Sequence, residues 1–125
     1  MPMPRIIHVR NLDFPNQTAL QIKYCDSFIC RLRGLTFRRP LSPTEGLLLV
    51  EKQDSRINTS IHMLGVSFDI AVIWINSSMQ VVDKVLAESW HLAYAPKDAA
   101  QYILEIHPDR LDEFEIGHKV KFEDV

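Results

Sequence analysis

The chain has 125 residues, of which 46% are apolar and 24% are charged, and its formal net charge is −2. This length suits one domain with its own core, and the composition excludes a disordered chain, a collagen and a coiled coil. No apolar run approaches the roughly 20 residues that a membrane-spanning helix needs. The first residues lack the apolar segment of a secretory signal, so we expect one cytoplasmic domain over residues 1–125.

Short apolar segments separated by turn residues predict a mainly β fold. Strands are expected near residues 4–9, 18–24, 46–50, 58–64, 70–75, 80–87, 100–106 and 119–122. Two short helices are expected, one over about 28–35 and one that begins at Pro108 and ends before Gly117. This pattern is typical of an antiparallel β-sandwich or jelly-roll, or of a partly closed barrel. The strand Ile70–Ile75 is apolar throughout, which indicates a central position with both faces covered.

The two cysteines, Cys25 and Cys30, are five positions apart, which is not the spacing of a redox motif or a zinc knuckle. Cys25 precedes the first predicted helix and Cys30 lies on its outer side, where side chains five apart do not face each other. We therefore predict two reduced, unbridged thiols that fill apolar space.

The search for chemistry gives only weak candidates for catalysis. The four glycines are isolated, which excludes a phosphate-binding loop, and the five histidines show no metal-ligand spacing, so we predict no cofactor and no metal. His62 and Asp69 flank one predicted turn and form the best acid–base pair. In the competing interpretation, Asp69 caps that turn or pairs with an arginine.

The segment 89–96 carries Trp90, His91 and Tyr94 in one loop, where we expect them to face one side. Trp and Tyr offer flat apolar faces with a polar group, which suits the recognition of a sugar or another flat ligand. These three residues, together with Arg38, are the candidates for ligand binding. The competing and favoured interpretation of the loop is an aromatic plug that closes one end of the fold.

Basic residues gather in the first third of the chain, where seven of them, up to Arg39, accompany two acidic residues. Arg33 is expected to pair internally with Asp69 or Glu105, because a guanidinium at the core boundary needs acceptors. Arg38 and Arg39 are candidates for contacts with an anion or a nucleic acid. The negative net charge argues against nucleic-acid binding in general.

Three stretches, taken in order, resemble a known family. They are Arg33-Gly34-Leu35-Thr36-Phe37-Arg38 with Gly46-Leu47-Leu48, then Ile61-His62-Met63 with Phe68-Asp69-Ile70, and finally Tyr94-Ala95-Pro96 with Ala100–Glu105 and Ile116-Gly117. Together they are similar to the bacterial and archaeal family called domain of unknown function 192, over about residues 22–122. The sequence departs from the family pattern at Thr36, where Met is usual, and at His118, where Asp is common. The resemblance implies a compact, mainly β fold of the sandwich or jelly-roll type and brings no established activity.

These observations favour a soluble, non-catalytic β-domain that binds a small molecule or a partner protein. One alternative is a hydrolase-type enzyme that uses His62 and Asp69 in a cleft. Another is anion or nucleic-acid binding through Arg38 and Arg39. No membrane association is expected, and the sequence leaves the ligand and the oligomeric state open.

Overall fold

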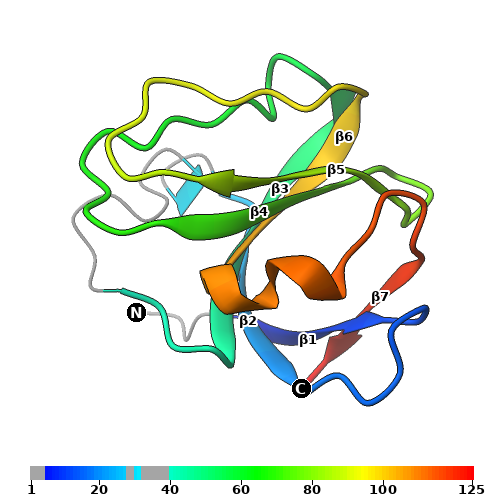
Figure 1. The fold of residues 1–125 in the computed structure, drawn as a ribbon. Helices are drawn as coiled ribbons and strands as arrows, with labels where there is room; N and C mark the ends of the chain where they lie inside the picture. Colours follow the sequence, from blue (N-terminus) through cyan, green and yellow to red (C-terminus); the bar gives the residue numbers. More distant parts are fainter. Residues whose placement is uncertain (1–4, 28–29, 32–39) are drawn as a thin grey trace.

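The computed structural model describes residues 5–27, 30–31 and 40–125, and these form one seven-stranded mixed sheet in the order β5-β4-β6-β3-β2-β1-β7 (Figure 1). A single 3-10 helix, η1 (Pro108–Glu113), accompanies the sheet in the described part of the chain. The strands are β1 (Ile6–Asn11), β2 (Leu20–Cys25), β3 (Glu45–Ser55), β4 (Ile70–Ile75), β5 (Val81–Ala87), β6 (Ala100–Ile106) and β7 (Val120–Asp124).

The prediction of a mainly β fold is confirmed, but the described strands form one open sheet rather than a two-sheet sandwich or jelly-roll. The sheet is not purely antiparallel either, because β2 and β3 run parallel, with Gln21 opposite Glu45 and Cys25 opposite Leu49. The alternation of apolar residues locates strands, whereas it carries no information on which strands become neighbours. This parallel pair is the reason that the expected antiparallel topology is wrong.

Two of the expected elements differ from the structure. The expected strand 58–64 is mostly a loop, which makes one isolated bridge, between Ile61 and Tyr94. The helix expected over 28–35 lies largely outside the described residues, and the two residues of it that are described, Cys30 and Arg31, are helical. The second helix begins at Pro108 as predicted, but it is a short 3-10 helix, because the chain extends at Phe114 and buries that ring completely.

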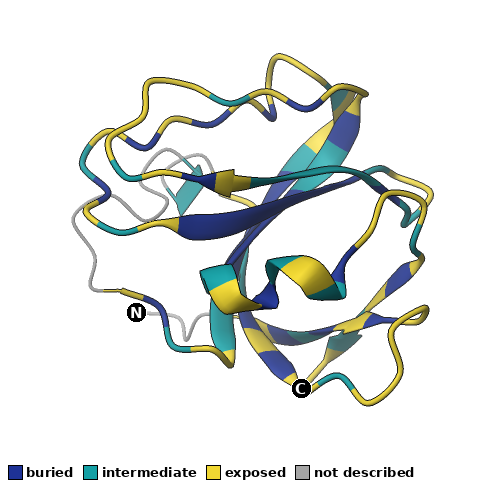
Figure 2. Cartoon of the chain, in the orientation of Figure 1, coloured by how far each residue is buried: buried dark blue, intermediate teal, exposed yellow. Residues whose placement is uncertain are grey.

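Strand β4 is buried at all six positions, and its ribbon is dark blue along its length in Figure 2. It lies between β5 and β6, so it is second from an edge of the sheet rather than central. Both of its faces are covered, as the uninterrupted apolar sequence predicts, since each face of the sheet carries a core of its own.

The inner core lies on the face of the sheet that η1 covers, and Phe114 belongs to it. The sheet bends so that β4–β5 and β1–β7 lie on either side of η1 (Figure 1). At one corner the two edge strands approach each other, and an isolated bridge joins Gln80 to Lys119. The residues of the inner core are Ile7, Val9, Leu20, Ile22, Leu48, Val50, Ala71, Ile73, Ile75, Val81, Leu104, Ile106, Phe114 and Val120.

The outer core lies on the opposite face, where loops supply much of the described cover. Leu41, Ile61, Met63 and Val66 come from these loops. The remaining residues of the outer core come from the strands and are Cys25, Leu47, Leu49, Ile70, Val72, Trp74, Ala87, Ala100 and Ile103. The loops that cover the outer core carry most of the described residues that the sequence nominates for function.

Arg110 is a buried arginine that joins three segments of the chain. Its guanidinium donates to the carbonyl oxygens of Thr18 and Pro43, both at 2.7 Å, and to the carboxylate of Glu113. A buried cation is costly unless its donors are satisfied, and here every nitrogen of the guanidinium has an acceptor. Arg110 therefore fixes η1 against the loops that precede β2 and β3.

Candidate functional site

Two loops of the outer face pair with each other and build the most distinctive surface of the described chain. Ile61 and Tyr94 exchange two backbone hydrogen bonds of 2.8 Å. Met63 donates its N–H to the carbonyl of His91 at 2.9 Å and accepts the N–H of Trp90 at 3.0 Å. Ile61 and Met63 are buried in the outer core, and His62 and Leu64 alternate with them on the solvent side. We call the outward-facing set the loop-pair surface; it comprises His62, Leu64, Trp90, His91, Leu92 and Tyr94.

The rings predicted to act together are only partly brought together. His91 and Tyr94 stack with ring centroids 4.3 Å apart, and the Tyr94 hydroxyl accepts the backbone N–H of Glu88 at 3.0 Å. Trp90 has a positive φ of 62°, which is uncommon for a bulky residue, and its N–H is held by Met63. Arg38, the fourth residue nominated for ligand binding, lies outside the described residues.

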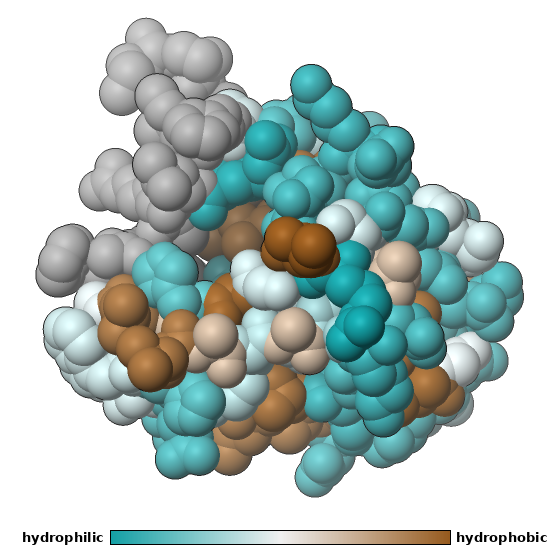
Figure 3. All heavy atoms as spheres, turned by 90° about the horizontal axis from the view of Figure 1, so that it is seen from above, coloured by the Kyte–Doolittle hydropathy of each residue, from teal (hydrophilic) through white to brown (hydrophobic). Residues whose placement is uncertain are grey.

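Several apolar side chains of the loop-pair surface face solvent. Leu92 is 75% exposed, Trp90 is 58% exposed and Leu64 is 42% exposed. Figure 3 looks onto the side of the molecule where these loops lie, and apolar side chains stand there among polar ones. The interpretation of this loop as a buried aromatic plug does not account for Trp90 or Leu92, since each exposes more than half of its surface.

His62 and Asp69 do not form a catalytic pair in the described structure. The Nδ1 atom of His62 accepts the backbone N–H of Leu64 at 3.3 Å, and Asp69 accepts the backbone N–H of Ser89 at 2.9 Å. His62 thus accepts from its own loop and Asp69 from the loop that follows β5, and neither is hydrogen-bonded to the other. The bond to Ser89 ties the start of β4 to the loop that carries Trp90, which is a different loop from the turn that Asp69 is predicted to cap.

Glu105 is the one buried carboxylate of the sheet in the described chain. It lies on β6, opposite Leu47 on one side and Val72 on the other, and its side chain belongs to the outer face. Among the described residues, its Oε1 atom has no hydrogen-bond partner. Burial raises the pKa of Glu105 from its usual 4.5 to about 7, because the ionised form loses its hydration. Arg33, its predicted partner, lies outside the described residues, so the ion pair stays a prediction.

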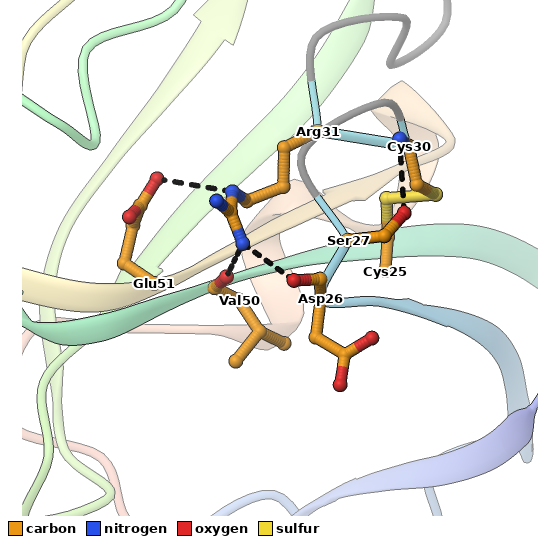
Figure 4. Close-up of a disulfide and its surroundings, with 7 residues drawn as sticks. All are labelled: Cys25, Asp26, Ser27, Cys30, Arg31, Val50 and Glu51. Atoms are coloured by element: carbon orange, nitrogen blue, oxygen red, sulfur yellow. Dashed lines mark hydrogen bonds and ion pairs between the residues drawn. A yellow bond between two sulfur atoms is a disulfide. The ribbon is translucent and has the colours of Figure 1, made fainter.

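The prediction of two free thiols is wrong, because Cys25 and Cys30 form a disulfide (Figure 4). Cys25 is the last residue of β2, and the chain bends at Ser27 before the helical residues Cys30 and Arg31, which brings Cys30 back toward Cys25. The Cα atoms of the two cysteines are 5.6 Å apart, which lies within the range that a disulfide spans. The spacing rule for side chains on one helix does not apply to this pair, because Cys25 lies in β2 and only Cys30 is helical.

Two pockets among the described residues lie away from the loop-pair surface. One, of about 220 Å³, is lined by Ile6, Gln21, Lys23, Leu41, Glu45 and Gly46. The other, of about 260 Å³, is lined by residues 9–12 and 14–19. Across the described ranges, no three His, Cys, Asp or Glu side chains are grouped so that they could share a metal ion. In the same ranges, no helix is long and apolar enough to cross a membrane.

Comparison with known proteins gives a family and a fold. Residues 11–122 match the model of the family DUF192, described as "Uncharacterized ACR, COG1430". The UPF0127 protein TK1120 of Thermococcus kodakarensis is 44% identical over 68% of this chain and 52% of its own length, so the chain spans about half of that relative. The UPF0127 protein PH1112 of Pyrococcus horikoshii is 36% identical over 82% of this chain and 87% of its own length.

Two solved structures share the fold at low sequence identity. A putative transcription regulator from Sinorhizobium meliloti superposes with a TM-score of 0.80 and 15% identity, over 96% of this chain and 94% of that chain. A protein of unknown function from Novosphingobium aromaticivorans superposes with a TM-score of 0.77, also at 15% identity, over 93% of this chain and 83% of that chain. At this level of identity, the likeness shows a shared fold and nothing about activity.

Proposed function

The chain belongs to the DUF192 family, and from the geometry of its loop-pair surface we propose that it is a non-catalytic binding module for a partner protein. The observation that carries the proposal is Trp90, a large apolar side chain that is more than half exposed and has a positive φ. A left-handed backbone at such a residue costs on the order of 1–3 kcal/mol and persists where the surroundings hold it. Backbone strain of this kind concentrates at sites of recognition. The proposal also places the protein in the cytoplasm.

The exposure of the apolar side chains favours a protein over a small molecule as the ligand. Small ligands are usually enclosed by pocket walls that bury most of their surface. Leu64, Trp90 and Leu92 instead project from two paired loops, and an exposed apolar group with a polar rim is typical of a docking surface between proteins. Trp and Tyr are also the side chains that dominate the binding energy of such interfaces.

The hydrogen bonds of the loops support a binding role over a hydrolytic one. A general base must reach the proton that it removes, and a second group must orient it. His62 instead accepts the backbone N–H of Leu64, and Asp69 accepts the backbone N–H of Ser89. These bonds give the loop-pair surface a fixed shape, which lowers the entropy that binding would otherwise cost.

The test uses light-activated crosslinking followed by reconstitution from purified components. A benzoylphenylalanine at position 92 would capture the partner in the native host, and the same group at position 116 serves as a control. Ile116 is a suitable control because it is exposed to a similar degree to Trp90 but lies outside the paired loops. The captured protein is then purified and titrated against the full chain, and acrylamide quenching of the exposed Trp90 is followed while Trp74 remains buried.

We expect the partner to protect Trp90 from the quencher and Trp90→Ala to weaken binding at least about tenfold, as loss of an interface anchor does. Ile116→Ala should leave the affinity unchanged. Unchanged affinity of Trp90→Ala would overturn the proposal. Capture of a second copy of this chain, with a concentration-dependent mass in sedimentation, would assign the surface to self-association instead.

A further inference from the structure

The two sulfurs of the disulfide differ in their access to solvent. Cys25 is 1% exposed and belongs to the outer core, beside residues such as Leu49. Cys30 is only partly buried and packs against the edge of that core. Thiol–disulfide exchange requires a thiolate to approach one sulfur in line with the bond, so access decides which sulfur is attacked. In this pair, Cys30 is the accessible one.

Hydrogen bonds hold the turn between the cysteines independently of the disulfide (Figure 4). The hydroxyl of Ser27 accepts the backbone N–H of Cys30 at 3.2 Å, and the carbonyl of Ser27 accepts the N–H of Arg31 at 3.0 Å. These two bonds close the turn from within. Neither bond involves a sulfur atom, so neither is broken by opening the disulfide.

Arg31 fastens this turn to the sheet. Its guanidinium donates to the carbonyl oxygen of Asp26 at 2.5 Å and to that of Val50 at 3.1 Å, and its Nε atom lies 3.4 Å from a carboxylate oxygen of Glu51. The side chain of Arg31 extends away from the sulfurs and toward β3 (Figure 4). Arg31 is thus a positioning residue, which keeps the two cysteines near each other without contacting the sulfur atoms.

The disulfide therefore adds little constraint to a turn that is already closed. The stabilisation from a disulfide grows with the length of the loop that it closes, and only four residues lie between these cysteines. The fold therefore depends little on this disulfide. Because one of its cysteines is accessible and the other is held close by, the bond is suited to opening and closing again.

We propose that Cys25 and Cys30 form a reversible thiol–disulfide couple that exchanges with low-molecular-weight thiols through Cys30. A thiolate of the small thiol attacks Sγ of Cys30, the bond between the cysteines breaks, and its electron pair passes to Sγ of Cys25, which takes up a proton. A second small thiolate attacks the mixed disulfide on Cys30 and releases the oxidised small molecule. Cys30 is then protonated. Overall, two small thiols are oxidised to one disulfide, and the protein disulfide is reduced to two thiols.

The test is equilibration of the full chain with mixtures of reduced and oxidised glutathione, followed by acid quenching, alkylation and intact-mass measurement. We expect a reversible change between the protein disulfide and the dithiol, with the same midpoint from both directions and with the far-ultraviolet and near-ultraviolet circular dichroism of the fold retained. Opening of the disulfide only together with loss of the near-ultraviolet signal would show a purely structural bond and overturn the proposal.

Single cysteine variants test the assigned order of attack. In Cys25→Ser, oxidised glutathione should form a mixed disulfide with Cys30, and in Cys30→Ser the buried Cys25 should react at least about tenfold more slowly. Equal rates in the two folded variants would refute the assignment of Cys30 as the attacked sulfur.

The positioning role of Arg31 has its own readout. Arg31→Met should lower the effective concentration of one thiol at the other, so the disulfide should open at a smaller ratio of reduced to oxidised glutathione. The matched control is Arg56→Met, because Arg56 also donates to a backbone carbonyl, that of Pro96 at 3.1 Å, but far from the cysteines in the chain. An unchanged midpoint of disulfide opening in Arg31→Met would contradict the proposed positioning role of Arg31.

Discussion

Gly46 lies against the backbone of Glu105 so closely that a Cβ atom on Gly46 would stand 2.5 Å from the Glu105 carbonyl oxygen. The same Cβ would lie 2.8 Å from a methyl carbon of Ile106 and 2.9 Å from one of Ile22. The absence of a side chain at this point lets β3 pack between β2 and β6 while the inner core closes over it.

Gly46→Ala should therefore destabilise the fold by about 1–3 kcal/mol, because backbone and core must both shift to admit the methyl group. The measurement is the free energy of unfolding from denaturant titration. Ala100→Gly, which removes a buried methyl group from β6 without a clash, gives a comparison for the loss of ordinary packing. A Gly46→Ala protein as stable as the native one would show that β3 has room to move.

Glu105→Gln should make the stability less dependent on pH. Burial raises the pKa of Glu105 from 4.5 to about 7, so between these values the folded state holds a proton that the unfolded chain has released. The free energy of unfolding of the native protein should therefore fall as pH rises from 4.5 to 7, by about 3 kcal/mol in total, and the contribution of Glu105 should be constant above pH 7. Glu105→Gln carries no proton to lose, so it should be the more stable protein at pH 8.

The control for this experiment is Glu88→Gln, an exposed position that should keep the native pH profile. A native stability that does not fall over this range would mean that a cation holds Glu105 ionised. The predicted partner is Arg33, and in that case Arg33→Met would cost about 3–5 kcal/mol by leaving a buried charge unpaired.

Trp90→Gly should be more stable than Trp90→Ala by about 1 kcal/mol, since only glycine adopts a positive φ without cost. Both variants lack the indole ring, so their difference isolates the strain of the backbone at a φ of 62°. Denaturant unfolding followed by circular dichroism gives the comparison. Equal stabilities would indicate that the loop relaxes to a negative φ when the ring is removed.

Nucleic-acid binding should be weak at physiological salt, because affinity for the phosphate backbone grows with the number of phosphates neutralised and the chain carries a net charge of −2. Fluorescence anisotropy with mixed-sequence oligonucleotides provides the measurement. Submicromolar binding that disappears in the double variant Arg38→Ala, Arg39→Ala would instead establish the basic segment as an interface.

Local patterns account for the parts of the fold that the sequence predicts well. The strand at residues 100–106 has its predicted boundaries, and the burial of both faces of β4 follows from six consecutive apolar residues. Local patterns do not predict which strands pair, because β2 and β3 become parallel partners only through the path of the chain between them. The disulfide is not predictable from helix spacing either, since Cys25 ends β2 and the bend at Ser27 brings the helical residue Cys30 back beside it.

In the candidate site, too, the sequence predicts local features but not the contacts that folding creates. The aromatic loop is visible in the sequence, but its pairing with residues 61–63 depends on backbone hydrogen bonds that no side-chain pattern encodes. The buried position of Glu105 follows from its place between apolar neighbours on β6, whereas its unpaired oxygen is a property of the assembled core. Arg110 looks like an ordinary surface residue of a charged helix, and two of its three acceptors, the carbonyl oxygens of Thr18 and Pro43, lie in segments that only folding brings to it.

The pairing of β1 with β7 has a consequence for how the protein is made. Ile7 lies opposite Asp124 and Asn11 lies opposite Val120, so the two strands join across a sequence separation of more than a hundred residues. Contacts between such distant segments close large loops and slow folding. During synthesis, β1 acquires its second neighbour only after β7 has left the ribosome, and until then its free edge is available to other chains. A ribosome that stalls before residue 120 would therefore release a chain that is prone to aggregation.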